Sequence, residues 1–231
     1  MRSFHSLAKT LFLLTLVFLL PFSCTKDNST KTKTIEATPA QQQDAVNTAT
    51  TATKAEGVFE NSLKIAIENL PTANSTGSKV NVAGISTSTS GSNTSITFSN
   101  FSFAGFSVGG TYTLTPALVK GAFAYKVTIT SGVIQFPGSQ AFKYSGTEYF
   151  QPVGTSLSIT GNFKLQMGTG LPINGTITKP LMLNAGCPNI SSGTITFVYL
   201  IFLRPTLDFG DGTCDDQAKL SLGALSENVT I

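Results

Sequence analysis

From residue 96 onward, apolar and polar side chains alternate along most of the chain. Ile96 and Phe98 alternate with Thr and Ser, and Gly-rich breaks separate this run from later ones. Gly161 lies within the clearest run, where it can bend the strand or admit a bulky neighbour. The apolar members of that run are Leu157, Ile159, Phe163, Leu165 and Met167. Alternation of this kind predicts antiparallel strands with one wet face, arranged as an antiparallel sheet or a β-sandwich.

A different spacing precedes the strands and predicts a helix over 54–69. Five apolar residues fall three or four positions apart, which places them on one helical face. Pro71 ends the pattern, because proline disfavours α geometry in the residue before it. We therefore expect a single β-rich domain over 54–231 that begins with this helix. The five residues are Phe59, Leu63, Ala66, Ile67 and Leu70.

The stretch 24–53 is rich in Thr, Ala, Gln and Lys, and Ile35 and Val46 are its only larger apolar residues. A segment of this composition buries too little surface to offset the entropy of ordering. The sequence predicts a disordered tether with some helical tendency towards its end.

The stretch 197–203 interrupts the alternation because all of its residues are apolar or aromatic. One interpretation is a central strand covered on both faces. The other is a partly exposed apolar surface for a partner or a lipid.

The N-terminus has the three zones of a signal peptide over 1–23. Arg2 and Lys9 form a basic start, and the apolar run Leu11–Leu20 follows. That run is shorter than the about 20 residues a membrane-spanning helix needs. The ending Ser23-Cys24 resembles a lipobox, which implies that Cys24 becomes the lipid-bearing N-terminus. Pro21 stands where a typical lipobox has Leu, so ordinary secretion with cleavage near Ser23 is the alternative.

The residues after Cys24 bear on the membrane face. Thr25-Lys26-Asp27-Asn28 resembles the tags that direct some lipoproteins to the outer face of the outer membrane. The other interpretation is a solvated linker. We expect the protein in the cell envelope, lipid-anchored to the outer membrane, with the outer face as one option.

Charge and composition exclude several function classes. The chain has 15 basic and 12 acidic residues, but the leader holds two of the basic ones, so the mature protein is nearly neutral. The sequence contains no basic patch of the kind that nucleic-acid-binding proteins carry. The only histidine, His5, lies in the leader. The mature chain therefore lacks Ser-His-Asp or Cys-His catalysis and His-liganded zinc, and no cofactor is indicated.

Two cysteines remain after Cys24, namely Cys187 and Cys214. An even pair in an oxidising compartment predicts one disulfide.

The C-terminal region resembles a group of secreted, β-rich bacterial lipoproteins of no established function. The resemblance rests on Cys187, on Ser192-Gly193-Thr194, on the Asp-Phe-Gly-Asp-Gly-Thr-Cys-Asp run at 208–215 and on a short final strand. It implies a fold and an envelope location, and no activity.

The same Asp/Gly run permits two chemical interpretations. Its four carboxylates could bind calcium through hard oxygen ligands, although their spacing does not match the Asp-x-Asp-x-Asp-Gly loop. Asp-Gly is also the pair that a tight hairpin turn prefers, and we expect the turn rather than a metal site. The weak calcium candidates are Asp208, Asp211, Asp215 and Asp216.

An acid pair for glycoside hydrolysis would need Glu148 beside one of these aspartates, because Glu148 is the only acid between Glu68 and Asp208. Nothing in the sequence brings them together. We therefore expect a protein that is not an enzyme.

Three functions remain. The leading hypothesis is a structural or adhesive envelope lipoprotein, bound to the membrane through Cys24, with an envelope protein as one candidate partner. A glycan-binding module is the second, since five tyrosines could stack on sugars, although Trp is absent. A carrier of an apolar ligand is the third, suggested by 17 Phe and the 197–203 run.

Overall fold

The computed structural model describes residues 37–70 and 82–231. The predicted signal peptide, Cys24 and the first part of the expected tether lie outside these residues. The described chain contains helix α2 (Pro39–Glu68) and one sheet of 11 antiparallel strands. The strands are β1 (Ile85–Ser90), β2 (Asn93–Phe103), β3 (Phe106–Val119), β4 (Ala122–Gln135), β5 (Phe142–Val153), β6 (Ser156–Met167), β7 (Ile173–Leu183), β8 (Ser192–Val198), β9 (Thr206–Asp211), β10 (Gln217–Leu222) and β11 (Leu225–Thr230).

The order of strands in the sheet is the order in the sequence, from β1 at one edge to β11 at the other. Each strand pairs antiparallel with the next one, as short connections allow. The mainly β class with one N-terminal helix is therefore confirmed. Of the two arrangements considered, the protein adopts the single sheet.

Helix α2 begins at Pro39, so the expectation of a disordered tether is wrong for residues 39–53. Thr38 caps the helix: its hydroxyl accepts from the Gln41 amide, and the Gln41 side chain accepts from the Thr38 amide. This capping box satisfies helix N–H groups that would otherwise lack partners. Small side chains then pack fully buried along one face, namely Ala45, Ala49, Ala52 and Ala55. The predicted end is confirmed, because the helix stops at Glu68 with Asn69 as its C-cap.

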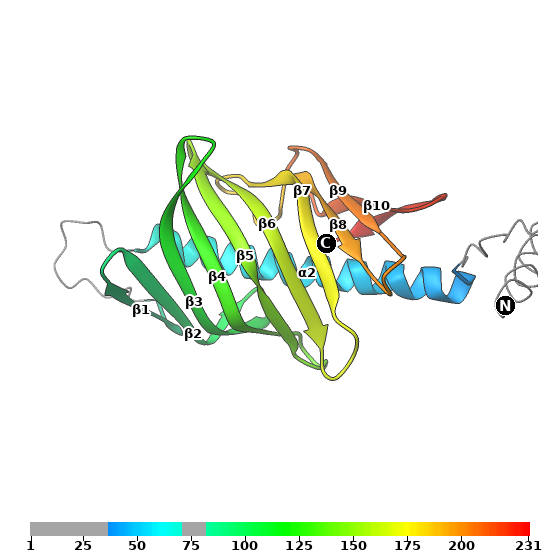
Figure 1. Cartoon of the computed structure of the whole chain (residues 1–231), viewed down its shortest axis with the longest axis horizontal. Coiled ribbons are helices and arrows are strands. Elements are labelled where there is room, and N and C mark those ends of the chain that lie inside the picture. The colour runs from blue at the N-terminus through cyan, green and yellow to red at the C-terminus, as the bar shows by residue number, and fades with distance from the viewer. Residues whose placement is uncertain (1–36, 71–81) are drawn as a thin grey trace, which may run out of the picture. The chain divides into compact units, whose positions relative to one another are not determined.

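The sheet curves around α2, because strands far apart in its order contact the same helix. These strands are β2, β3 and β4 on one side and β7 and β10 on the other. Register shifts in several strand pairs, such as those at Gly109/Tyr112 and Ile129/Gly132, increase the local twist and bend that this curvature needs. In Figure 1 the strands cross in front of the cyan helix at a steep angle.

The core lies between α2 and the sheet face that it covers. Phe59 of the helix stacks on Tyr144 of β5, with ring centroids 4.4 Å apart, and also contacts Tyr112 of β3. Further ring contacts extend from Tyr112 to Phe98, from Tyr144 to Phe163, and from Phe163 to Phe197. A chain of aromatic rings therefore runs across the sheet beneath the helix.

The apolar run at 197–203 is not one covered strand, so the first interpretation of that stretch is wrong. Strand β8 ends at Val198, and a tight turn follows in which Leu200 and Ile201 adopt positive φ angles of 49° and 69°. Tyr199 then pairs with Leu203 across the turn. Ile201 is 89% exposed and Phe202 is 44% exposed. The turn therefore presents apolar side chains to solvent, which agrees with the exposure that the second interpretation expects. The partner or lipid of that interpretation stays a prediction.

Candidate functional site

Three glutamates meet inside the core, between the helix and the middle of the sheet. Glu56 and Glu60 lie one turn apart on α2, and Glu148 lies on β5. All three are fully buried, with no exposed surface. One carboxylate oxygen from each lies within 4.8 Å of the other two. We refer to these three residues as the glutamate cluster.

Tyr144 is the polar neighbour that links two members of the glutamate cluster. Its hydroxyl lies 2.6 Å from Glu56 Oε2 and 2.6 Å from Glu148 Oε1. A phenol carries one proton, so it donates to one carboxyl and the other carboxyl must itself carry a proton to donate back. No donor outside the cluster reaches its remaining oxygens, which are Glu56 Oε1, Glu148 Oε2 and both oxygens of Glu60. When a carboxyl is protonated, Glu56 can bond to Glu60 and to Glu148.

Burial raises the pKa of all three carboxyl groups well above the ordinary value. Repulsion between the carboxylates raises the pKa further: Glu60 acts on Glu56, Glu148 on Glu60, and Glu56 on Glu148. The bond from Tyr144 acts in the opposite direction on Glu56 and Glu148. A bare charge is expensive in such a place, so these carboxyls must hold protons or meet a cation.

Gly161 of β6 makes room for the cluster on the strand beside β5. It pairs in register with Glu148 and has a φ angle of +141°, which residues other than glycine rarely adopt. A Cβ atom at Gly161 would lie 2.7 Å from Glu148 Cα and 2.4 Å from the Thr147 carbonyl oxygen. The sequence left open a bend or a bulky neighbour at Gly161. The register with β7 shifts between Ile159 and Gly161, and the atoms closest to Gly161 belong to the backbone that carries Glu148.

A separate groove of about 260 Å³ opens at the surface beside α2. Gly57 and Val58 of the helix form part of its wall, and no other atom lies within 4 Å of the place where a Gly57 Cβ would stand. The opposite walls come from the β2–β3 hairpin, the β7–β8 loop, strand β9 and the chain's last residue. They contribute Phe103, Phe106, Ile190, Phe209 and Ile231. The groove is thus mainly apolar and partly lined by phenylalanine.

Cys187 and Cys214 form the predicted disulfide, with Cα atoms 5.7 Å apart. The bond joins the β7–β8 loop to the β9–β10 loop. The β7–β8 loop is also held by the helix, because Asn61 donates to the Pro188 carbonyl at 3.0 Å and Lys64 donates to the Asn184 carbonyl at 3.2 Å. Helix and C-terminal strands are therefore connected through one loop.

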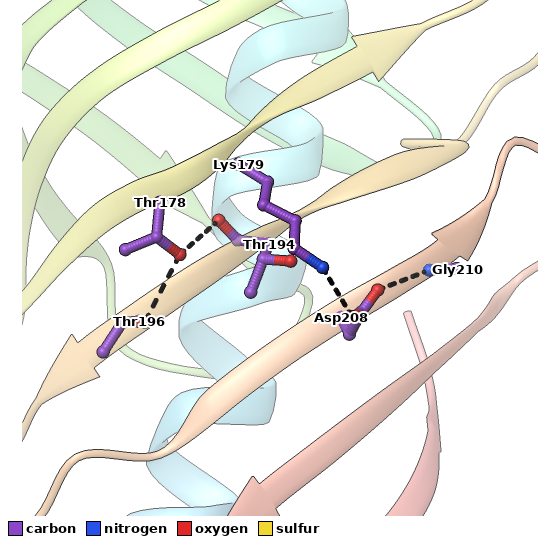
Figure 2. Close-up of polar contacts among 6 residues, drawn as sticks. All are labelled: Thr178, Lys179, Thr194, Thr196, Asp208 and Gly210. Carbon is purple, nitrogen blue, oxygen red and sulfur yellow. Dashed lines mark hydrogen bonds and ion pairs between the residues drawn. The ribbon is translucent and has the colours of Figure 1, made fainter.

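The aspartates of the C-terminal run make turns. The side chains of Asp208, Asp211 and Asp215 each accept from the backbone N–H two residues later, the pattern by which Asp stabilises a turn. Figure 2 shows Lys179 of β7 reaching past Thr194 of β8 to Asp208, with a separation of 3.6 Å. These contacts favour the turn interpretation of the run.

The structure places Glu148 in the core, whereas the Asp208 side chain is 44% exposed on the outer surface. The acid pair that a glycosidase would need is therefore not formed by these residues. Within the described residues, the acidic groups close enough to share a cation are the three glutamates rather than the aspartates of the hairpin. Sequence reasoning missed the cluster, although the i, i+4 spacing of Glu56 and Glu60 signalled that they share a helix face.

Comparison with known proteins returned no relative: no family model, curated protein or solved structure matches this chain. No helix within residues 37–70 and 82–231 has both the length and the apolar character required to cross a membrane.

Proposed function

We propose that this protein is an exported lipoprotein, held in the cell envelope by lipid at Cys24, in which the β domain has a structural or adhesive role. The observation that carries the proposal is the leader ending in Ser23-Cys24. The disulfide supports it, because such bonds persist in oxidising compartments. We also propose the outer face of the outer membrane as its location, because the residues that follow Cys24 resemble the tags that direct some lipoproteins there.

The site geometry supports a role without catalysis. The three glutamates are the one set of three or more acidic groups that come together within the described chain, and none of them has any surface exposed to solvent. A substrate would have to enter a packed core to reach them. The exposed aspartates of the C-terminal run, such as Asp208 and Asp215, accept backbone hydrogen bonds within turns.

The lipid anchor is tested by comparing the full chain with its Cys24→Ala variant in fractionated cells. The wild-type chain should partition into detergent, whereas the variant should appear in soluble fractions, because each buried CH₂ of an acyl chain contributes about 0.8 kcal/mol to membrane binding. Thr25→Ala is the matched control and should remain in the membrane. Continued detergent partitioning of the Cys24→Ala chain would refute lipid attachment at this residue.

The carrier of an apolar ligand is the second candidate, and the Phe-lined groove favours it. The volume of about 260 Å³ is close to the lower end of the range of about 300–1,000 Å³ for ligand pockets, so a single acyl chain is the occupant we propose. Glycan binding gains no comparable support. Tyr112 and Tyr144 are buried in the core, and Tyr199 bonds to Asp44. The half-buried Tyr125 and Tyr149 pair with Phe150 and Lys126 rather than with each other.

Gly57 allows a sharp test of this second candidate. Gly57→Phe should fill the groove and abolish binding of a fluorescent long-chain fatty acid, while Gly57→Ala should leave binding nearly unchanged. The folded state of both variants is checked by circular dichroism. Equal binding by the two variants, or no binding by the wild-type chain, would reject the carrier function.

A further inference from the structure

The glutamate cluster concentrates three carboxyl groups where water cannot balance their charge. Glu56, Glu60 and Glu148 are each fully buried, and rings and aliphatic groups surround them, with Phe59 stacked on Tyr144 beside the cluster. The ion pair that the described residues form, between Lys179 and Asp208, lies elsewhere on the surface. The nearby helix cation, Lys64, donates to the Asn184 carbonyl instead. The cluster therefore has no cationic side chain bonded to it within the described chain.

Glu60 provides an observation that goes beyond proximity. Both of its carboxyl oxygens are buried and no donor outside the cluster reaches either of them, so Glu56 is the one side chain that can share a proton with it. One of the Glu60 oxygens lies within 4.8 Å of the oxygens of Glu56 and Glu148. A buried carboxylate without partners costs free energy that the fold must offset. Its direction towards the other two carboxylates indicates a missing partner that all three share.

We propose that Glu56, Glu60 and Glu148 together bind one hard divalent cation, with calcium as the best-fitting ion, and that this cation joins α2 to β5 in the core. The donor atoms are all oxygens, which suits calcium, magnesium and manganese and not the softer metals. Tyr144 bonds one oxygen each of Glu56 and Glu148, which leaves four carboxyl oxygens for an ion. The bound cation replaces the proton that one of these carboxyls otherwise carries.

Hydration favours calcium among these ions. The three oxygens lie within 4.8 Å of one another, which permits calcium–oxygen distances of about 2.3–2.6 Å and also the shorter distances of about 2.0–2.1 Å that magnesium requires. Magnesium retains several water molecules in most sites, and the closed core beneath α2 leaves little place for them.

The position of the cluster indicates what the ion does. Glu56 and Glu60 belong to the helix, whereas Glu148 follows Glu56 by 92 positions and belongs to a central strand. A cation bound by all three is a cross-link between the helix and the sheet. Because the site is closed in the folded protein, the ion enters as the helix packs, and binding is coupled to folding.

The test uses the full chain and two isosteric variants of helix α2. Glu60→Gln removes a ligand charge without breaking any hydrogen bond of the described structure, and Glu68→Gln is the matched control because Glu68 is exposed on the same helix. Metal content is measured by mass spectrometry after dialysis, and melting temperature is measured in chelator and after adding calcium, manganese or magnesium chloride.

We expect about one divalent ion per chain for the wild-type protein and Glu68→Gln, and much less for Glu60→Gln. At a hundredfold excess of ion over its Kd, the melting temperature of the wild-type chain should rise by roughly 5–10 °C relative to chelator. That rise should shrink in Glu60→Gln.

Two results would overturn the proposal. One is a wild-type chain that retains no divalent ion and melts at the same temperature with and without each metal, which would mean that protons neutralise the cluster. The other is a Glu60→Gln variant that binds as much metal as Glu68→Gln. The first result depends only on the wild-type protein, so it decides the question even if Glu60→Gln fails to fold.

Discussion

At the scale of single residues, two glycines show opposite reasons for lacking a side chain. Gly161 pairs with Glu148 at φ +141°, and an added Cβ would collide with backbone atoms of β5. Gly57 lies in the middle of α2, where an added Cβ would meet nothing within 4 Å. The first position needs glycine for the fold, whereas the second keeps a groove open at the surface.

Substituting each glycine by alanine should therefore change stability in opposite directions. Gly161→Ala should lower the free energy of unfolding by about 1–3 kcal/mol or more, because it combines a strained backbone with a clash. Gly57→Ala should raise it by roughly 0.5–1 kcal/mol, because alanine forms helix more readily. Urea unfolding of both variants measures the two changes. A stable Gly161→Ala protein would show that β5 and β6 can move apart without loss.

At the scale of elements, helix α2 depends on its N-terminal cap for its first turns. Thr38 and Gln41 exchange hydrogen bonds that satisfy backbone groups in the first turn. Thr38→Ala should cost about 1 kcal/mol of stability. Gln43→Ala, at an exposed position of the same helix, is the control and should be nearly neutral. Thermal unfolding compares the two, and an equal effect of both would mean that the cap does not contribute.

The disulfide is the second stabilising feature at this scale. It fixes the β7–β8 loop, whose carbonyl groups accept hydrogen bonds from Asn61 and Lys64 of the helix. It closes a loop of 27 positions, for which the chain-entropy model gives about 3–4 kcal/mol. Reductant should therefore lower the melting temperature clearly and leave the β signal intact at low temperature. The Cys187→Ser/Cys214→Ser double variant should melt like the reduced protein and ignore reductant. An unchanged melting temperature under reductant would contradict the expected contribution.

How much the sequence predicts depends on whether a signal is local. Alternation predicts the strands, because a pleated strand places every second side chain on one face. The pattern of larger apolar residues does not predict the helix over residues 39–53. Alanines such as Ala49 and Ala52 are only weakly hydrophobic, although they are fully buried. The same pattern misses the glutamate cluster because Glu56 and Glu60 look like a solvated helix face. Only the fold brings Glu148 to them.

At the scale of the whole molecule, α2 and the sheet form one core, since the buried side chains of both belong to the same cluster. The expected consequence is that residues 39–53 are as well protected as the central strands. Hydrogen exchange followed by mass spectrometry should show slow exchange for peptides covering Ala45–Ala55 and for β4–β6, because such amides open only with the core. The edge strands β1 and β11 serve as the internal control and should exchange faster. Rapid exchange over 39–53 would restore the tether interpretation.

The collinear order of the strands fixes the sequence in which a growing chain can complete its interior. An exported chain emerges from its N-terminus, so its elements become available for folding in the order of the sequence. Helix α2 is therefore the first described element to appear and has no partner, while its two core glutamates stand in water with their charges solvated. Strand β5, which carries Glu148, emerges only after the first four strands. The three acids therefore cannot leave water together before β5 is available. Cys214 emerges later still, so the disulfide cannot form until nine of the strands have emerged.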